Sequence, residues 1–164
     1  MAKKILILNG SPKKDGNTAS LVEWFAGSCQ KSPKYECVID DEAKPVLGRM
    51  ASADVIVMAT PLYFFSASAQ LKAVVDRMFS LYKWNNEKNT FESPLRGKTM
   101  ILLASAYEDT GLDALEKPFR LTADYTGMKF ESLLVAGAGV SGNIIKLKGI
   151  KEKTMELGMR SAAK

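Results

Sequence analysis

The chain has 164 residues, of which 46% are hydrophobic and 25% charged, a composition typical of a globular protein with a real core. It contains no histidine, which removes the commonest general base and metal ligand and disfavours Ser-His or Cys-His hydrolase chemistry. The net charge is +5, but the lysines are spread along the chain rather than gathered in one run, so nucleic-acid binding is not expected.

We expect one domain, residues 1–164, located in the cytoplasm. The four apolar residues after Lys4 are too few for a signal-peptide core, and no apolar run is long enough to cross a membrane. The two cysteines, Cys29 and Cys37, are too few for a disulfide framework and lack the spacing of zinc or iron–sulfur ligands. No metal site is therefore predicted.

Short apolar runs alternate with longer helical patterns along the chain. This alternation predicts parallel strands joined by crossover helices. Strands are predicted at residues 4–9, 35–39, 54–59, 99–104 and 130–136. Helices are predicted at residues 18–29, 41–52, 69–84 and 150–162, and between 112 and 126, where Pro118 should interrupt the helix early.

The predicted fold is α/β, with a doubly wound five-stranded parallel sheet, the flavodoxin-like strand order 2-1-3-4-5 and helices on both faces. In such a sheet, ligands bind beyond the carboxyl ends of the strands, at the point where the strand order reverses. We therefore expect the loops after the first, third and fourth strands to form the functional site.

The loop after the first predicted strand begins at Gly10 and reads GSPKKDGNT. Its glycines and hydroxyl residues lead into a helix, whose first N–H groups and positive dipole end attract an anion. It is not a Walker A motif, because five residues separate Gly10 from Gly16 and Asn17 stands where lysine is required. The pattern favours one terminal phosphate held by Ser11, Asn17, Thr18 and backbone N–H groups. A plain turn with a helix cap is the alternative.

The loop after the third predicted strand carries three consecutive aromatic residues, Tyr63, Phe64 and Phe65. In an exposed connection these side chains expose apolar surface unless they cover something, and a flat conjugated ring is a natural partner for them. Packing on a neighbouring helix or on a second subunit is the alternative. The loop after the fourth strand, residues 105–111, should reach the same crevice.

Together these motifs resemble the NADPH-dependent FMN reductase family, which are FMN-binding oxidoreductases of the flavodoxin-like superfamily. The resemblance covers most of the chain. It rests on residues 9–18, on the run Pro61-Leu62-Tyr63-Phe64, and on the following helix with SAQLK at 68–72 and Asp76-Arg77. The family's pattern places FMN phosphate in the first loop and the flavin ring beside the second and third.

The resemblance implies FMN as cofactor, NAD(P)H as transient electron donor, and a quinone, nitro compound, flavin or similar small molecule as acceptor. It also implies a homo-oligomer, dimer or tetramer, and we hypothesise a homodimer. No catalytic side chain is assigned, because the flavin itself carries out the redox chemistry. The implied cofactor-binding residues are Ser11, Lys13, Gly16, Asn17, Thr18, Pro61, Leu62, Tyr63, Phe64, Phe65, Ser105 and Tyr107.

The sequence departs from the family in three places. Phe65 stands where many relatives have glycine. Glu108 and Asp109 replace a glycine-rich third loop and would repel the phosphates of an incoming nicotinamide. The segment between Cys29 and Asp54 is short and lacks the four cysteines of the iron–sulfur flavoproteins, so no cluster is predicted.

Three other functions are weighed against this one. A flavodoxin-type electron carrier would bind FMN without oxidising a nicotinamide directly. A receiver domain of a response regulator shares the strand order, but Asn9-Gly10-Ser11 and Thr60-Pro61 stand where such domains resemble one another in acidic residues. A structural or regulatory protein that has lost flavin is the last alternative.

Overall fold

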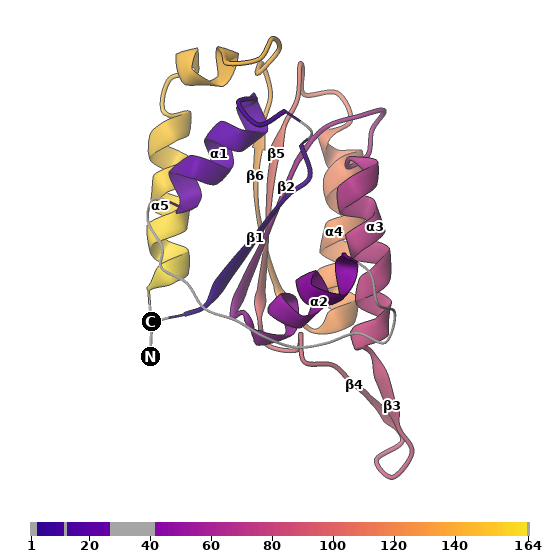
Figure 1. Ribbon diagram of the computed structural model, residues 1–164. Coiled ribbons are helices and arrows are strands. Elements are labelled where there is room, and N and C mark those ends of the chain that lie inside the picture. Colours follow the sequence, from indigo (N-terminus) through magenta and orange to yellow (C-terminus); the bar gives the residue numbers. More distant parts are fainter. Residues whose placement is uncertain (1–2, 12, 27–41, 164) are drawn as a thin grey trace.

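Four parallel strands form the central sheet of the computed structural model, which describes residues 3–11, 13–26 and 42–163 (Figure 1). The strands are β1 (Ile5–Asn9), β2 (Val55–Pro61), β5 (Thr99–Ser105) and β6 (Lys129–Val135), in the spatial order β1-β2-β5-β6. This arrangement agrees with the predicted order for the four strands it contains. The remaining predicted strand, at residues 35–39, lies outside the described residues.

Helices cover both faces of this sheet (Figure 1). They are α1 (Asn17–Ala26), α2 (Ala43–Ser52), α3 (Ala69–Arg77), α4 (Leu112–Thr126) and α5 (Ile150–Ala162), with short 3₁₀ turns η1 (Met78–Leu81) and η2 (Asn143–Lys146). Alternate residues of β2 serve opposite faces: Val55 and Val57 pack in the core under α1 and α5, whereas Ile56 and Met58 pack under α2, α3 and α4. Because both faces are covered, the strand is apolar from Val55 to Ala59.

The predicted helix at 69–84 is too long. Helix α3 ends at Arg77, the turn η1 follows, and the chain then forms a hairpin of β3 (Lys83–Asn85) and β4 (Thr90–Glu92). The Tyr82 ring stacks on Tyr125, with 5.2 Å between the ring centroids. This tertiary contact outweighs the helical spacing of apolar residues that predicted a longer helix. The hairpin projects from the end of the molecule opposite the carboxyl ends of the strands (Figure 1).

Helix α4 runs without a break through Pro118, so the predicted early interruption is wrong. Proline has no N–H to donate to the carbonyl of Ala114, which weakens the helix at this turn. The buried side chains of Leu115 and Phe119 pack in the core on either side of Pro118 and hold the helix on the sheet. Tertiary packing therefore outweighs the local cost of the proline.

Polar contacts on the same helix tie it to β6. The Glu116 carboxylate accepts hydrogen bonds from the Ser132 hydroxyl and, at 2.9 Å, from the Arg120 guanidinium. The bond from Ser132, followed by the contacts with Arg120, holds the pKa of Glu116 below its usual value, against the opposing effect of burial. Helix α4 is thereby anchored beside the loop that follows β5.

Replacing the exposed Pro118 by alanine should raise the free energy of unfolding by about 1–3 kcal/mol, because the N–H restored at this position completes the helix ladder. Urea unfolding measures the change. The exposed neighbour Lys117→Ala serves as a control and should alter the unfolding free energy by less than about 0.5 kcal/mol. A Pro118→Ala variant no more stable than the wild type would contradict this account of the helix.

Candidate functional site

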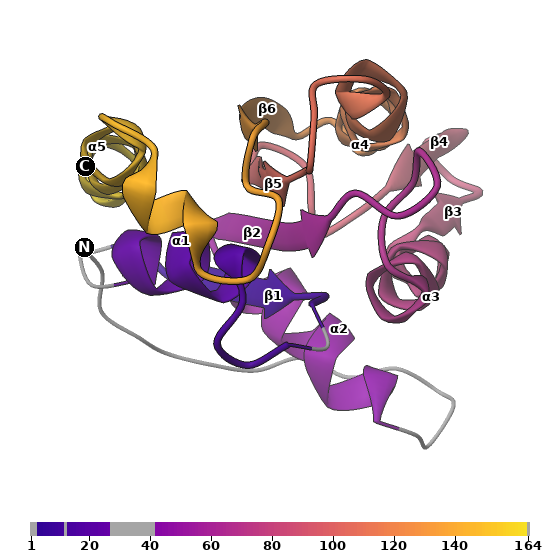
Figure 2. The same cartoon turned by 90° about the horizontal axis from the view of Figure 1, so that it is seen from above.

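The loops after β1, β2, β5 and β6 lie together at the carboxyl ends of the parallel strands (Figure 2). Residues of these loops line two adjoining cavities, each of about 220 Å³. The first cavity is lined by Ser11, Lys13, Gly16, Asn17, Thr18, Pro61, Leu62, Tyr63, Ser105, Ala106, Tyr107, Ala138, Gly139 and Ser141. The second is lined by Leu62, Phe64, Phe65, Tyr107, Glu108 and Thr110. Leu62 and Tyr107 belong to both linings, so the two cavities share a wall.

The loop between β1 and α1 is shaped by hydrogen bonds between its own neighbouring residues. The Ser11 N–H donates to Asn9 Oδ1 at 3.0 Å, and the Ser11 hydroxyl oxygen accepts from the Lys13 N–H at 3.3 Å. The Gly16 N–H donates to the Lys13 carbonyl at 3.4 Å. Helix α1 begins at Asn17, directly on the wall of the first cavity, and the first N–H groups of a helix have no partner within it.

The Asn17 side chain joins this helix start to the loop after β6. Its Nδ2 donates to the carbonyls of Ala138 at 2.6 Å and Val140 at 3.3 Å, and its Oδ1 accepts from the Ile144 N–H at 3.2 Å. The Asn17 side chain thus forms a bridge between segments that are distant in the sequence. Asn17 lines the first cavity, but its amide is committed to positioning the neighbouring loop.

A second polar link connects α1 with β5. The hydroxyl groups of Thr18 and Ser105 lie 2.9 Å apart, and both residues are buried. Both residues line the first cavity, so this pair forms part of its wall. The sequence analysis predicts both residues as cofactor contacts. Their hydrogen bond to each other could not be predicted, because α1 and β5 are distant in the sequence.

A tight two-residue turn forms at residues 63–66. Tyr63 and Ser66 exchange both of their backbone hydrogen bonds, at 2.9 and 3.0 Å. Phe64 and Phe65 have φ values of 43° and 63°, the left-handed conformation that a type I′ turn requires and that Asn-Gly usually provides. A phenylalanine in this conformation costs about 1–3 kcal/mol. Phe64 is 98% exposed, so packing within the chain does not offset that cost.

This aromatic turn is nevertheless held firmly in place. The Leu62 N–H donates to the Ser105 carbonyl at 2.9 Å, which ties the start of the turn to β5. The Phe65 ring rests on the backbone of Gly111, where an added Cβ would lie 2.3 Å from the ring. Gly111 also has a φ of 85°, so only glycine suits this position. The backbone of the turn and the Phe65 ring are therefore held beside the second cavity, which both phenylalanines line.

The third loop brings Tyr107 between the two cavities. Its carbonyl accepts from the Gly137 N–H at 3.1 Å, and the Ala138 N–H donates to the Ala106 carbonyl at 2.9 Å. A Cβ added at Gly139 would lie 3.6 Å from the Tyr107 ring, so the ring lies against this loop. The ring itself is 80% exposed and is available to a ligand on its open side.

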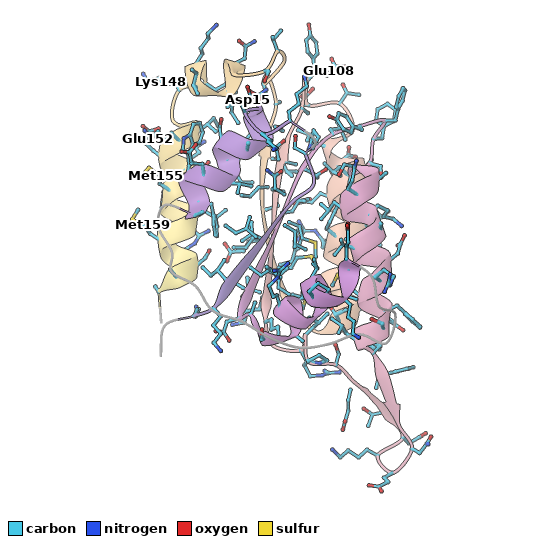
Figure 3. The ribbon with its side chains drawn as sticks, in the orientation of Figure 1. Asp15, Glu108, Lys148, Glu152, Met155 and Met159 are labelled. Carbon is cyan, nitrogen blue, oxygen red and sulfur yellow. The ribbon has the colours of Figure 1, made fainter. Side chains whose placement is uncertain are left out.

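Charge is divided between the two cavities. Among the described lining residues, Lys13 is the charged side chain of the first cavity and Glu108 that of the second. Asp15 and Glu108 both lie at this end of the molecule, well away from Met159 on α5 (Figure 3). Within residues 3–11, 13–26 and 42–163, no group of three or more potential ligand residues is placed to hold a metal ion.

None of the helices in the described part of the chain is long and apolar enough to cross a membrane. The two cysteines, Cys29 and Cys37, lie outside that part.

Every residue predicted for cofactor binding lines the first cavity except Phe64 and Phe65, which line the second. The sequence analysis misses Ala138, Gly139 and Ser141, which come from the loop after β6. A usable signal is present, because the run GAGVSG at 137–142 follows a predicted strand and is rich in glycine. The strand-order rule directs attention to the other three loops instead.

Residues 3–155 match the family model described as a flavodoxin-like fold. An iron–sulfur flavoprotein of Methanocaldococcus jannaschii is 29% identical over 100 residues, a match that covers 45% of this chain and 51% of that protein. The chain therefore matches about half the length of this curated relative.

Solved structures share the fold over almost the whole chain. The Trp repressor binding protein from Bacillus subtilis has a TM-score of 0.71 at 22% identity, covering 96% of this chain and 99% of that one. The FMN-dependent NADH-azoreductase from Bacillus anthracis, solved in complex with FMN, has a TM-score of 0.67 at 16% identity, covering 98% and 100%. At these identities the likeness shows a common fold.

Exchanging Asn17 for aspartate should loosen the loop after β6, because a carboxylate cannot donate to the Ala138 and Val140 carbonyls and repels them. We expect the free energy of unfolding to fall by about 1–3 kcal/mol and hydrogen exchange to accelerate in residues 138–144. Asn86→Asp, the same change in the exposed hairpin turn, is the control. Unchanged exchange in that loop would refute the bridging role of Asn17.

Proposed function

The chain belongs to the family with the flavodoxin-like fold, and from this premise we propose that it is an FMN-dependent NAD(P)H oxidoreductase. It passes electrons from a nicotinamide to a small acceptor such as a quinone, a nitro compound or a flavin. The observation that carries the proposal is a single cavity lined both by the start of α1 with its polar loop and by aromatic and apolar residues of the loops after β2 and β5. The shared fold of the FMN-bound azoreductase supports it.

The polar end of the first cavity suits a phosphate. Ser11 contributes a hydroxyl, Lys13 an ammonium group, and the first turn of α1 its N–H groups. Gly16 brings the loop backbone close, with an added Cβ only 3.1 Å from the Lys13 Cβ. These groups can surround a terminal phosphate with hydrogen-bond donors and one positive charge, without a metal ion.

The part of the same cavity formed by the loops after β2 and β5 suits a flat ring. Pro61, Leu62, Tyr63 and Tyr107 form walls that are largely apolar. The N–H groups of Leu62 and Tyr63 are used within the protein, by the carbonyls of Ser105 and Ser66. At the turn's centre, the N–H groups of Phe64 and Phe65 find no partner among the described residues and are available to the polar edge of a ring.

FMN, when bound, supplies the capacity to take a hydride from NAD(P)H and pass electrons to the acceptor. The chain's own residues bind and orient it. Lys13 and the α1 N–H groups offset the phosphate charge, while Tyr63 and Tyr107 shield the ring from water. The free backbone N–H groups of the aromatic turn would offer hydrogen-bond donors to the polar edge of that ring. No side chain has to act as a general acid or base, which suits a chain without histidine.

The proposal includes a homodimer and keeps the expected cytoplasmic location and single domain of residues 1–164. Exposed aromatic side chains beside the cavities, above all Phe64, support a partner copy near the site. In the complete five-stranded order 2-1-3-4-5, the predicted strand at residues 35–39 would pair with β1, which is an edge strand of the described sheet.

The proposed activity is tested by loading the purified protein with FMN, removing the excess, and recording visible absorbance before and after anaerobic addition of NADPH or NADH. We expect FMN to be retained and its absorbance near 450 nm to be bleached, on the order of one nicotinamide oxidised per flavin. Retained flavin that stays oxidised would favour an electron carrier. A protein that retains no FMN would refute the proposal.

The assignment of the phosphate end is tested by reversing the charge of Lys13. The Lys13→Glu variant should bind FMN at least about tenfold more weakly, because an attraction becomes a repulsion in a partly enclosed site. Lys14→Glu is the matched control, since this exposed neighbour is not among the cavity's lining residues, and its affinity should change less than about threefold. Quenching of FMN fluorescence measures both dissociation constants. Equal losses in the two variants would contradict the assignment.

A further inference from the structure

We propose that the second cavity binds the electron acceptor and selects flat aromatic molecules that carry no negative charge. This inference rests on the proposed function, because an acceptor site has meaning only beside a bound flavin. It goes further by assigning a separate cavity, lined by Leu62, Phe64, Phe65, Tyr107, Glu108 and Thr110, to the second substrate.

The position of the second cavity fits an acceptor. It shares Leu62 and Tyr107 with the part of the first cavity that suits a flat ring, so a molecule bound there lies next to that ring. Electron transfer to a small acceptor requires such close approach. The phosphate end, with Ser11 and Lys13, belongs to the first cavity alone.

The walls of the second cavity favour a planar aromatic molecule. Phe64, Phe65 and Tyr107 are 98%, 59% and 80% exposed, so their ring faces are largely uncovered by the chain itself. Aromatic side chains bind flat conjugated molecules by offset or edge-to-face stacking. The contact with Gly111 holds the Phe65 ring in place before any ligand arrives. A site prepared in this way loses little entropy on binding.

The charge of the second cavity disfavours anions. Glu108 is the charged side chain among its described lining residues, and the exposed Asp109 follows it in the chain. A carboxylate or sulfonate on the acceptor would meet this negative charge without a cation on the same wall. A single such repulsion at about 4 Å, in surroundings close to water, changes affinity about fivefold, and more where water is excluded.

The selection against negative charge is tested with two nitro compounds of nearly equal shape. These are 4-nitrobenzamide, which is neutral, and 4-nitrobenzoate, which is an anion. Their dissociation constants are measured by titration calorimetry on the oxidised, FMN-loaded protein without nicotinamide, so that binding is read apart from turnover. The wild type should bind the amide about three- to tenfold more tightly than the carboxylate. The variant Glu108→Gln should reduce this preference to within about twofold.

The control for the charge change is Glu152→Gln, which removes the same charge from α5 (Figure 3). Its preference should equal that of the wild type. Comparison between variants also cancels repulsion from the FMN phosphate, which is present in all of them. An equal affinity for the two compounds in the wild type, or a preference unchanged by Glu108→Gln, would overturn the inference.

The aromatic wall is tested by Phe64→Asn, because asparagine adopts the left-handed backbone more readily and no buried contact is lost. This variant should unfold no more easily than the wild type, yet bind both nitro compounds at least about threefold more weakly with the preference for the amide kept. Unchanged affinities would contradict a role of the turn in acceptor binding.

Protein that fails to retain FMN would overturn the proposed function and this inference together, whereas retained FMN with no charge preference overturns this inference alone.

Discussion

The site depends first on the parallel register of the central strands. Asn9 pairs with Ala59, Pro61 with Ser105, and Ser105 with Val135, so β1, β2, β5 and β6 end at nearly the same level. Their loops therefore begin side by side. Two polar links then join elements that are distant in sequence: Asn17 holds the loop after β6, and Thr18 meets Ser105 at the end of β5. This alignment brings residues of several loops onto the walls of each cavity.

The aromatic turn shows where the chain departs from the rules that favour stability. Asn-Gly would form this type I′ turn without strain, but the sequence places Phe64 and Phe65 there, both in the left-handed conformation. The first is almost fully exposed, and the second is accommodated by Gly111. Strain and exposed apolar surface that gather at one point beside a cavity indicate that the turn serves a ligand or a partner rather than the core.

Much of the fold could be predicted because buried parallel strands and α5 leave strong local patterns. The runs Val55–Met58 in β2 and Met100–Leu103 in β5 are apolar throughout, and helix α5 has its predicted bounds. The β3–β4 hairpin and the unbroken α4 could not be predicted, since Tyr82 and Pro118 owe their conformations to packing against distant residues. At the site, glycines and aromatics indicated three of the loops whose residues line the first cavity. The role of Asn17 was hidden, because its partners lie more than a hundred residues away.

The account's central claim is that the two ends of the first cavity hold the phosphate and the ring of one flavin. A crystal structure of the protein grown with FMN tests this most directly. The account predicts the phosphate within hydrogen-bond distance of the first N–H groups of α1 and near Lys13, with the ring beside Pro61, Tyr63 and Tyr107. Flavin bound elsewhere, or bound here with its phosphate turned toward Glu108, would contradict it.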